Sequence, residues 1–125
     1  MNFPTTLFVN NQSTPFNQCE KCHDGVGPFR FKDILGQVKG KQFVKYVHDD
    51  LIPPGSTFGD HPHRSGASFE EWYLCLSGEG VMTLDGKDYP MKPGDISVCY
   101  DQGSHGIRNT GKEDLRILVI GAAAI

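Results

Sequence analysis

Short stretches that alternate apolar and polar residues, or are apolar throughout, recur from about residue 29 to the end of the chain. Such stretches are typical of β-strands, and glycine and proline separate them at nearly regular intervals. The expected strands are residues 29–35, 43–52, 69–76, 80–84, 88–91, 95–100, 105–109 and 115–120. No amphipathic helix longer than about two turns interrupts them, which argues against a layered α/β fold. The pattern predicts an all-β barrel or sandwich.

Turn residues support this interpretation. Asp85-Gly86 stands between two expected strands, and this pair suits a tight hairpin turn that needs positive φ at both central residues. Pro53-Pro54-Gly55 and Lys92-Pro93-Gly94 predict turns of a different kind, in which proline ends strand pairing and glycine redirects the chain.

The length of 125 residues fits one domain. We expect an N-terminal arm over residues 1–25, which has weak strand signal, and a barrel domain over residues 26–125. The chain has 12 basic and 15 acidic side chains, a net charge of −3, and no basic run. Nucleic acid is therefore not expected as a partner.

The compartment is predicted from what the chain contains. Its longest apolar stretch, residues 118–125, is far shorter than the roughly 20 residues of a membrane span, so no membrane association is expected. The N-terminus lacks the features of a secretory signal, which predicts a cytoplasmic protein. Of the four cysteines, Cys75 and Cys99 lie in apolar runs and are expected to be small buried hydrophobic residues.

Three histidines and a glutamate form the strongest candidate site. His61 and His63 are two residues apart, a spacing that places both side chains on one face of a strand. Glu71 lies on the following strand and His105 follows the hairpin, so a barrel interior would bring three nitrogens and one oxygen together. This donor set suits a borderline divalent metal ion.

The spacing of these residues resembles the two motifs of the cupin family. The segment GSTFGDHPHRSGASFEEWYLCLSGEG resembles the first motif, with its characteristic positions at Gly55, His61, His63, Glu71 and Gly78. The segment PGDISVCYDQGSHGIRN resembles the second, with Pro93, Gly94, His105 and Asn109. The resemblance implies a small single-domain cupin with an antiparallel jelly-roll β-barrel.

This sequence departs from the family pattern in two places. Seven residues separate His63 from Glu71, and this spacer is longer than is usual in the family. Glu70, the last residue of the spacer, is therefore a rival candidate for the carboxylate ligand. Glu71 is preferred because six residues then separate it from Gly78, as in the family, and a slip of one residue would turn the carboxylate to the other face. Tyr100 and Gln102 stand where the family commonly has proline and glycine, so this loop is a candidate for substrate contacts.

The resemblance also implies a function. In cupins these four ligands hold one divalent transition metal ion (Mn, Fe, Ni, Zn or Co) and leave two coordination positions open, as in a catalytic site. We expect a metal-dependent enzyme with isomerase, lyase or dioxygenase chemistry, acting on an oxygen-rich metabolite such as a carboxylate or sugar derivative. The alternative is a binding module without catalysis. The resemblance to cupins of this size also implies that this protein forms a homodimer.

Several residues are weaker candidates. Strand parity places Tyr73 and Cys75 on the face of Glu71, which makes Tyr73 a candidate catalytic acid or base, although a barrel-filling aromatic is the simpler interpretation. His48 is expected at a solvated strand position. Arg108 and Lys45 could neutralise an acidic substrate, but surface charges are the default interpretation for both.

The segment Cys19-Glu20-Lys21-Cys22-His23 matches the C-x-x-C-H signature of covalent haem attachment. Covalent attachment ordinarily requires export, which the N-terminus does not indicate, and a zinc site would need ligands beyond Asp24. Cys19 and Cys22 are therefore interpreted as thiols in a loop, and a redox or opportunistic metal role is favoured over haem attachment.

Overall fold

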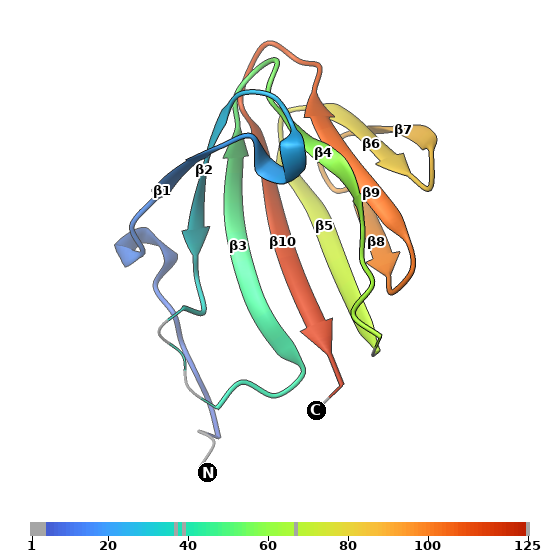
Figure 1. The fold of residues 1–125 in the computed structure, drawn as a ribbon. Coiled ribbons are helices and arrows are strands. Elements are labelled where there is room, and N and C mark those ends of the chain that lie inside the picture. The colour runs from blue at the N-terminus through green and yellow to red at the C-terminus, as the bar shows by residue number, and fades with distance from the viewer. Residues whose placement is uncertain (1–4, 37, 39, 67, 125) are drawn as a thin grey trace.

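Two antiparallel sheets face each other in the computed structural model, which describes residues 5–36, 38, 40–66 and 68–124 (Figure 1). The six-stranded sheet has the order β1-β2-β3-β10-β5-β8, and the four-stranded sheet has the order β4-β9-β6-β7. The strands are β1 (Asn17–Glu20), β2 (Pro28–Asp33), β3 (Val44–Ile52), β4 (Thr57–Pro62), β5 (Phe69–Ser77), β6 (Gly80–Leu84), β7 (Lys87–Met91), β8 (Ile96–Tyr100), β9 (Ser104–Asn109) and β10 (Leu115–Ala123). Two short 3-10 helices, η1 (Asn11–Ser13) and η2 (Cys22–Asp24), complete the described secondary structure. No helix in these ranges has the length and apolar character of a membrane span.

The jelly-roll fold class expected from the sequence is confirmed. Each of the eight expected strands is present, with ends shifted by at most three residues. The list of expected strands omitted β1 and β4. β1 is short and largely exposed, so it lacks an apolar alternation, and β4 contains a glycine and a proline, which weaken the strand signal. The expected hairpin joins β6 to β7, and Asp85 and Gly86 have φ values of 48° and 80°.

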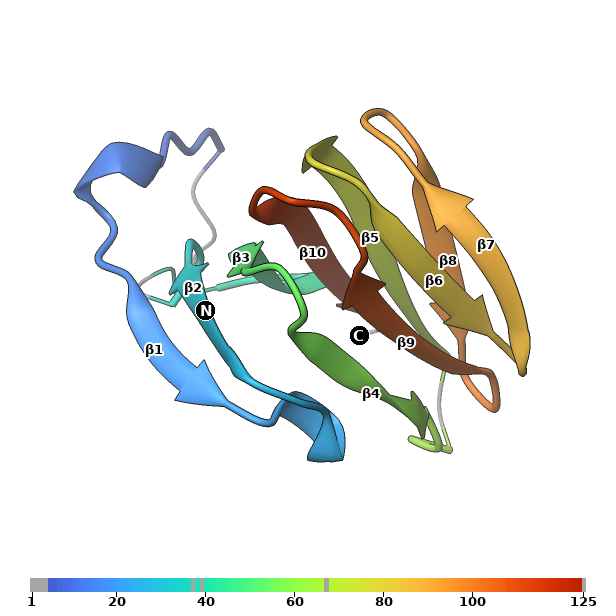
Figure 2. The ribbon, with the colours of Figure 1, turned by 90° about the horizontal axis from the view of Figure 1, so that it is seen from above.

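The view from above shows the two sheets facing each other (Figure 2), and the buried core residues come from strands of both. Along β5 the side chains alternate: Glu71, Tyr73 and Cys75 are buried, whereas Trp72 and Leu76 are exposed on the outer face. Ile52, Met82, Leu115 and Ile117 are fully buried between the sheets. Cys75 and Cys99 are buried free thiols, as expected.

The N-terminal residues pack along the edge of the larger sheet. β1 pairs with β2, with Asn17 opposite Phe31, and the Asn11 side chain donates a hydrogen bond of 2.9 Å to Asp49 Oδ2. Lys32 Nζ in turn donates to the Asn11 carbonyl at 3.0 Å. Residues 1–4 of the expected arm lie outside the described residues, and the division into an arm and a barrel at residue 25 stays a prediction.

Asn109 ties the end of β9 to two neighbouring segments. Its Nδ2 donates to the carbonyls of Ile52 at 2.8 Å and Glu113 at 2.7 Å, and its Oδ1 accepts from the Gly111 N–H at 2.8 Å. The residue is 5% exposed, so water does not replace these partners easily. The asparagine of the second motif therefore has a structural role.

Replacing Asn109 by alanine should lower the free energy of unfolding by about 1–3 kcal/mol, because three backbone groups, including the buried carbonyl of Ile52, lose their partner. Urea denaturation would measure the change. Thr110→Ala, at the exposed neighbouring position, is the control and should have little effect. A change of the same size in both variants would contradict the structural role of the Asn109 side chain.

Candidate metal centre

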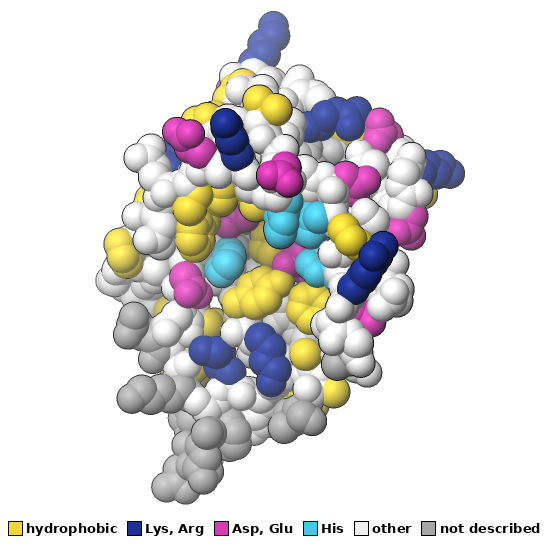
Figure 3. Space-filling view, viewed as in Figure 1, with side chains coloured by type: hydrophobic (Ala, Val, Ile, Leu, Met, Phe, Trp, Pro, Cys, Tyr) yellow, Lys and Arg dark blue, Asp and Glu magenta, His cyan; other side chains and the backbone are white. Residues whose placement is uncertain are grey.

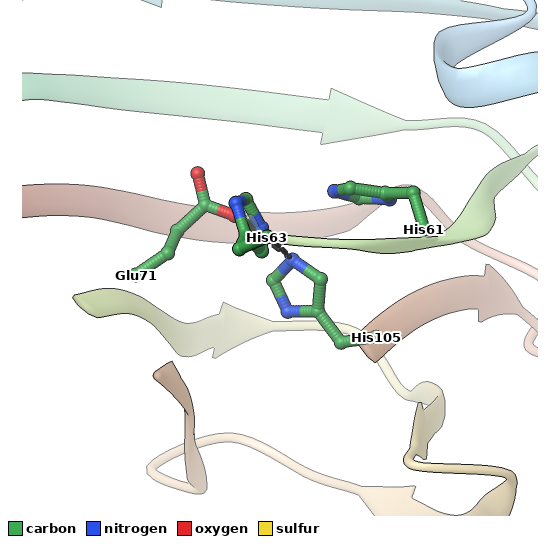
Figure 4. A group of neighbouring side chains, drawn as sticks. All are labelled: His61, His63, Glu71 and His105. Atoms are coloured by element: carbon green, nitrogen blue, oxygen red, sulfur yellow. Dashed lines mark hydrogen bonds and ion pairs between the residues drawn. The ribbon is translucent and has the colours of Figure 1, made fainter. Parts of the chain in front are cut away.

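Four side chains from both sheets converge at one point in the interior (Figure 4). His61 is in β4, and His63 follows directly after that strand. β4 pairs with β9 so that His61 stands opposite His105, whereas Glu71 reaches the same point from β5 of the other sheet. One potential ligand atom from each residue lies within 4.8 Å of the other three. The cluster is positioned to hold a metal ion.

Three of the four donor atoms are in close contact. Glu71 Oε1 lies 2.9 Å from His105 Nε2 and 3.2 Å from His63 Nε2, and the two imidazole nitrogens are 2.9 Å apart. Burial lowers the pKa of His63, which favours the neutral imidazole whose lone pair a metal requires. The two Nε2 atoms and the carboxylate oxygen thus face a shared space.

His61 contributes the observation that favours a metal most directly. Its Nδ1 lies 2.8 Å from the Gly59 carbonyl, so this nitrogen carries the hydrogen and donates it. Nε2 therefore has a free lone pair, and within the described part of the chain this atom is buried without a hydrogen-bond partner. Such buried polar atoms are uncommon because they cost free energy. A metal ion held between the four side chains would give Nε2 a partner.

Tyr46 in β3 holds the other oxygen of Glu71. Its hydroxyl donates a hydrogen bond to Glu71 Oε2, leaving Oε1 turned toward His63 and His105. Burial would raise the pKa of Glu71, but the hydrogen bonds from His105 and Tyr46 outweigh it and keep the pKa below its usual value. Burial raises the pKa of Tyr46, so its hydroxyl stays protonated and remains a donor. Tyr46 is not among the residues predicted from the sequence, because its contact with Glu71 depends on the pairing of distant strands.

The neighbouring carboxylate lies elsewhere. Glu70 Oε2 accepts a hydrogen bond from the Trp72 indole N–H, and Trp72 is on the outer face of the sheet. Strand alternation therefore places Glu71, and not Glu70, beside the histidines.

The helix η2 packs directly against the candidate ligand His61. The His23 ring stacks on His61 with 3.4 Å between centroids and 11° between planes. The close approach requires glycines, because a Cβ on Gly25 would lie 2.2 Å from the Thr57 carbonyl oxygen and one on Gly59 would lie 1.9 Å from that of His23. The loop interpretation of the two thiols is incomplete, since Cys19 lies in β1 and Cys22 in η2.

A cavity of about 280 Å³ adjoins the cluster, in the hollow around which histidine side chains gather in Figure 3. Phenylalanines of β2 and β4, together with a valine of β10, form its apolar wall. Its polar lining consists of Cys22, His23, Tyr46, His48, Asp50, Glu71 and Tyr73. Burial, with the nearby charges of Asp50 and Glu71, raises the pKa of the Cys22 thiol to about 11, so Cys22 is not a thiolate at neutral pH.

The weaker candidates occupy different environments. His48 is half-buried in the cavity wall, with its ring centroid 5.1 Å from those of both Phe31 and Tyr46, and 30% of its side chain remains exposed. Arg108 binds Asp88 at 2.9 Å and lies outside the cavity lining. Lys45 donates to the Gln42 carbonyl and is likewise absent from that lining.

Tyr73 lies where strand parity predicts it. Its ring is 4.9 Å from that of His105, it is 4% exposed, and it lines the cavity. Burial raises the pKa of its phenol well above the usual value, so the hydroxyl can donate a hydrogen bond but is not a base at neutral pH. A catalytic role for Tyr73 stays a prediction.

Tyr46→Phe should weaken metal retention by about 10–100-fold, because Glu71 loses the hydrogen bond that orients it. Competition with a coloured chelator would measure the affinity. Tyr100→Phe removes a hydroxyl from a residue that is 62% exposed and should leave the affinity unchanged. Equal affinities of wild type and Tyr46→Phe would show that Tyr46 does not position the carboxylate.

Comparison with known proteins places this geometry in a family. The cupin domain model matches residues 50–121. An oxalate-binding protein of Thermotoga maritima is 45% identical over 116 residues, which cover 93% of each chain. A crystal structure of a predicted oxalate decarboxylase from the same species superimposes with a TM-score of 0.85, at 29% identity, and covers 94% of this chain and 99% of that one.

A third relative is larger. The 5-nitrosalicylic acid 1,2-dioxygenase of a Bradyrhizobium species is 32% identical over 93 residues, which cover 73% of this chain but only 43% of the dioxygenase. The similarity to that enzyme therefore concerns less than half of its length. The matched motifs, the two sheets and the four converging side chains agree, and the chain belongs to the cupin family.

Proposed function

We propose that this cupin binds a small carboxylic acid, of the oxalate class, through a divalent transition metal ion held by His61, His63, Glu71 and His105. The observation that carries the proposal is the 45% identity to an oxalate-binding protein over nearly the full length of both chains. The donor cluster gives this similarity a physical basis, because carboxylate oxygens are good ligands for such ions.

The chain's own residues define how the metal would be held. His61 would bind through Nε2, because its Nδ1 is engaged by Gly59. His63 and His105 would also bind through Nε2, since both of these atoms face Glu71 Oε1. The ion supplies positive charge that attracts and polarises a carboxylate. No Lys or Arg belongs to the described lining of the cavity, so the chain itself presents no cationic side chain to such a ligand there.

Metal-loaded wild type should bind oxalate, and isothermal titration calorimetry would measure the affinity. Glu71→Gln should lose most of the metal and therefore the oxalate binding, because the amide is a weaker ligand than the carboxylate. Glu70→Gln removes the adjacent carboxylate on the outer face and should retain both. Metal analysis after dialysis would verify the loading. Wild type that retains metal but does not bind oxalate would contradict the proposed ligand class.

A second candidate function is catalysis on the bound acid, with isomerase, lyase or dioxygenase chemistry. The observation that favours it is the Tyr73 hydroxyl group in the wall of the cavity that adjoins the metal centre. A protonated phenol at this position could donate a proton to a reacting ligand. Iron in the purified protein would favour dioxygenase chemistry, whereas zinc or manganese would favour the isomerase or lyase alternatives.

If Tyr73 is a catalytic acid, Tyr73→Phe should lower turnover of a converted ligand by about 10²–10⁴-fold, with little change in ligand affinity or stability. Product formation would be followed by chromatography, and binding by calorimetry. Full turnover in the variant would exclude Tyr73 as the acid. A wild-type protein that binds a ligand tightly and converts none would favour the binding module.

The cytoplasmic location and the homodimer stay predictions. The outer face of the six-stranded sheet has exposed apolar side chains at Trp72, Ile96 and Tyr100, which are 37%, 54% and 62% exposed. Such a face is compatible with subunit association.

A further inference from the structure

Asp50 in β3 is a buried carboxyl group that the metal centre does not use. Alternate residues of β3, namely Tyr46, His48 and Asp50, line the cavity. Asp50 is 4% exposed, and β3 lies between β2 and β10, with Phe31 and Ile117 opposite it. The side chain is therefore inside the barrel, in the wall of the same cavity that Glu71 lines.

One oxygen of this carboxyl group lacks a partner. Within the described part of the chain, Asp50 Oδ1 is buried without a hydrogen bond. The preceding residue, Asp49, differs in this respect, because its carboxylate accepts two hydrogen bonds from Arg116, at 2.9 and 2.8 Å, and one from Asn11. Adjacent strand residues point to opposite faces, so Arg116 donates to Asp49 and not to Asp50.

The surroundings of Asp50 disfavour its charged form. The described cavity lining has no Lys or Arg, whereas Glu71 contributes a negative charge and the phenylalanines contribute apolar surface. Burial, and then the charges of Asp49 and Glu71, raise the pKa of Asp50 to about 8. These effects favour the neutral carboxylic acid, which has an O–H to donate.

We propose that Asp50 is a ligand-selecting residue, which donates a hydrogen bond from its neutral carboxyl to an oxygen of the bound acid that does not chelate the metal. This inference rests on the proposed function. The proposed contact would give the buried Oδ1 of this cavity-lining residue a partner, since a ligand would supply the missing acceptor. A neutral Asp50 also avoids a like-charge contact with the ligand, because an ionised Asp50 would repel an anionic acid.

The proposed contact defines the ligand class more narrowly. Oxalate and 2-oxo acids can chelate through two oxygens and still present a further oxygen at the far side. Acetohydroxamate chelates through both of its oxygens and has none left. Asp50 should therefore raise the affinity for acids such as oxalate, which keep a free oxygen, and should not change the affinity for acetohydroxamate.

The test compares Asp50→Asn and Asp50→Leu with wild type, each loaded with metal, by isothermal titration calorimetry at pH 7. Asp50→Leu has a similar size but no donor, and it should bind oxalate about 10–100-fold more weakly, as expected for a lost hydrogen bond to a charged acceptor. Asp50→Asn retains an N–H donor and should bind oxalate nearly as well as wild type. Both variants should bind acetohydroxamate with unchanged affinity.

Metal content and thermal denaturation of each variant show whether the site is intact, and Asp114→Leu at an exposed position is the control for the substitution itself. Oxalate binding by Asp50→Leu that equals or exceeds that of wild type would overturn the role of Asp50. An equal loss of affinity for oxalate and acetohydroxamate in Asp50→Leu would also overturn this role. If metal-loaded wild type binds acetohydroxamate but no oxalate, the proposed function fails instead, and the two failures are thus distinguishable.

Discussion

The burial of Glu71 between imidazole rings is the constraint on which the rest of the site depends. A carboxylate removed from water is costly unless other groups compensate its charge and occupy its lone pairs. In this barrel Tyr46 binds one oxygen, and His63 and His105 approach the other. These partners come from three different segments, so the carboxylate is satisfied only when the two sheets close on each other at this point.

The elements that complete the site lie largely outside the region that matches the cupin domain model. That region spans residues 50–121 and includes all four candidate ligands. The cavity, however, is also lined by His23 of η2, Phe31 of β2 and Tyr46 of β3. The shared barrel thus supplies the four candidate ligands, whereas the N-terminal strands and η2 supply much of the lining of the adjoining cavity.

The polarity of the cavity follows from the same arrangement. Glu71 and Asp50 lie in one wall, and no cationic side chain belongs to the described lining. Without a cation nearby, two acidic groups cannot both be ionised at low cost, and Glu71 has the hydrogen-bond partners. These surroundings raise the pKa of Asp50, through burial and then the charges of Asp49 and Glu71.

Local sequence pattern was sufficient for eight of the ten described strands and for the candidate ligands. Apolar alternation and turn residues predicted eight strands, because side chains of a strand alternate between faces whatever the fold. Parity also placed Tyr73 inside and Trp72 outside, since β5 has a clear alternation. The spacing of His61 and His63, with Glu71 and His105, matched a known motif, and these four side chains converge.

Only the tertiary structure decided which residues surround those ligands. In β3, Asp49 and Asp50 are adjacent and both buried, one bound by Arg116 and one facing the cavity, so the local pattern did not show which face is inside. His23 and His61 are distant in sequence, as are Tyr46 and Glu71, and their contacts exist because η2 packs on β4 and β10 lies between β3 and β5. Periodicity reports which residues share a face of a strand, but the pairing of distant strands determines what that face contacts.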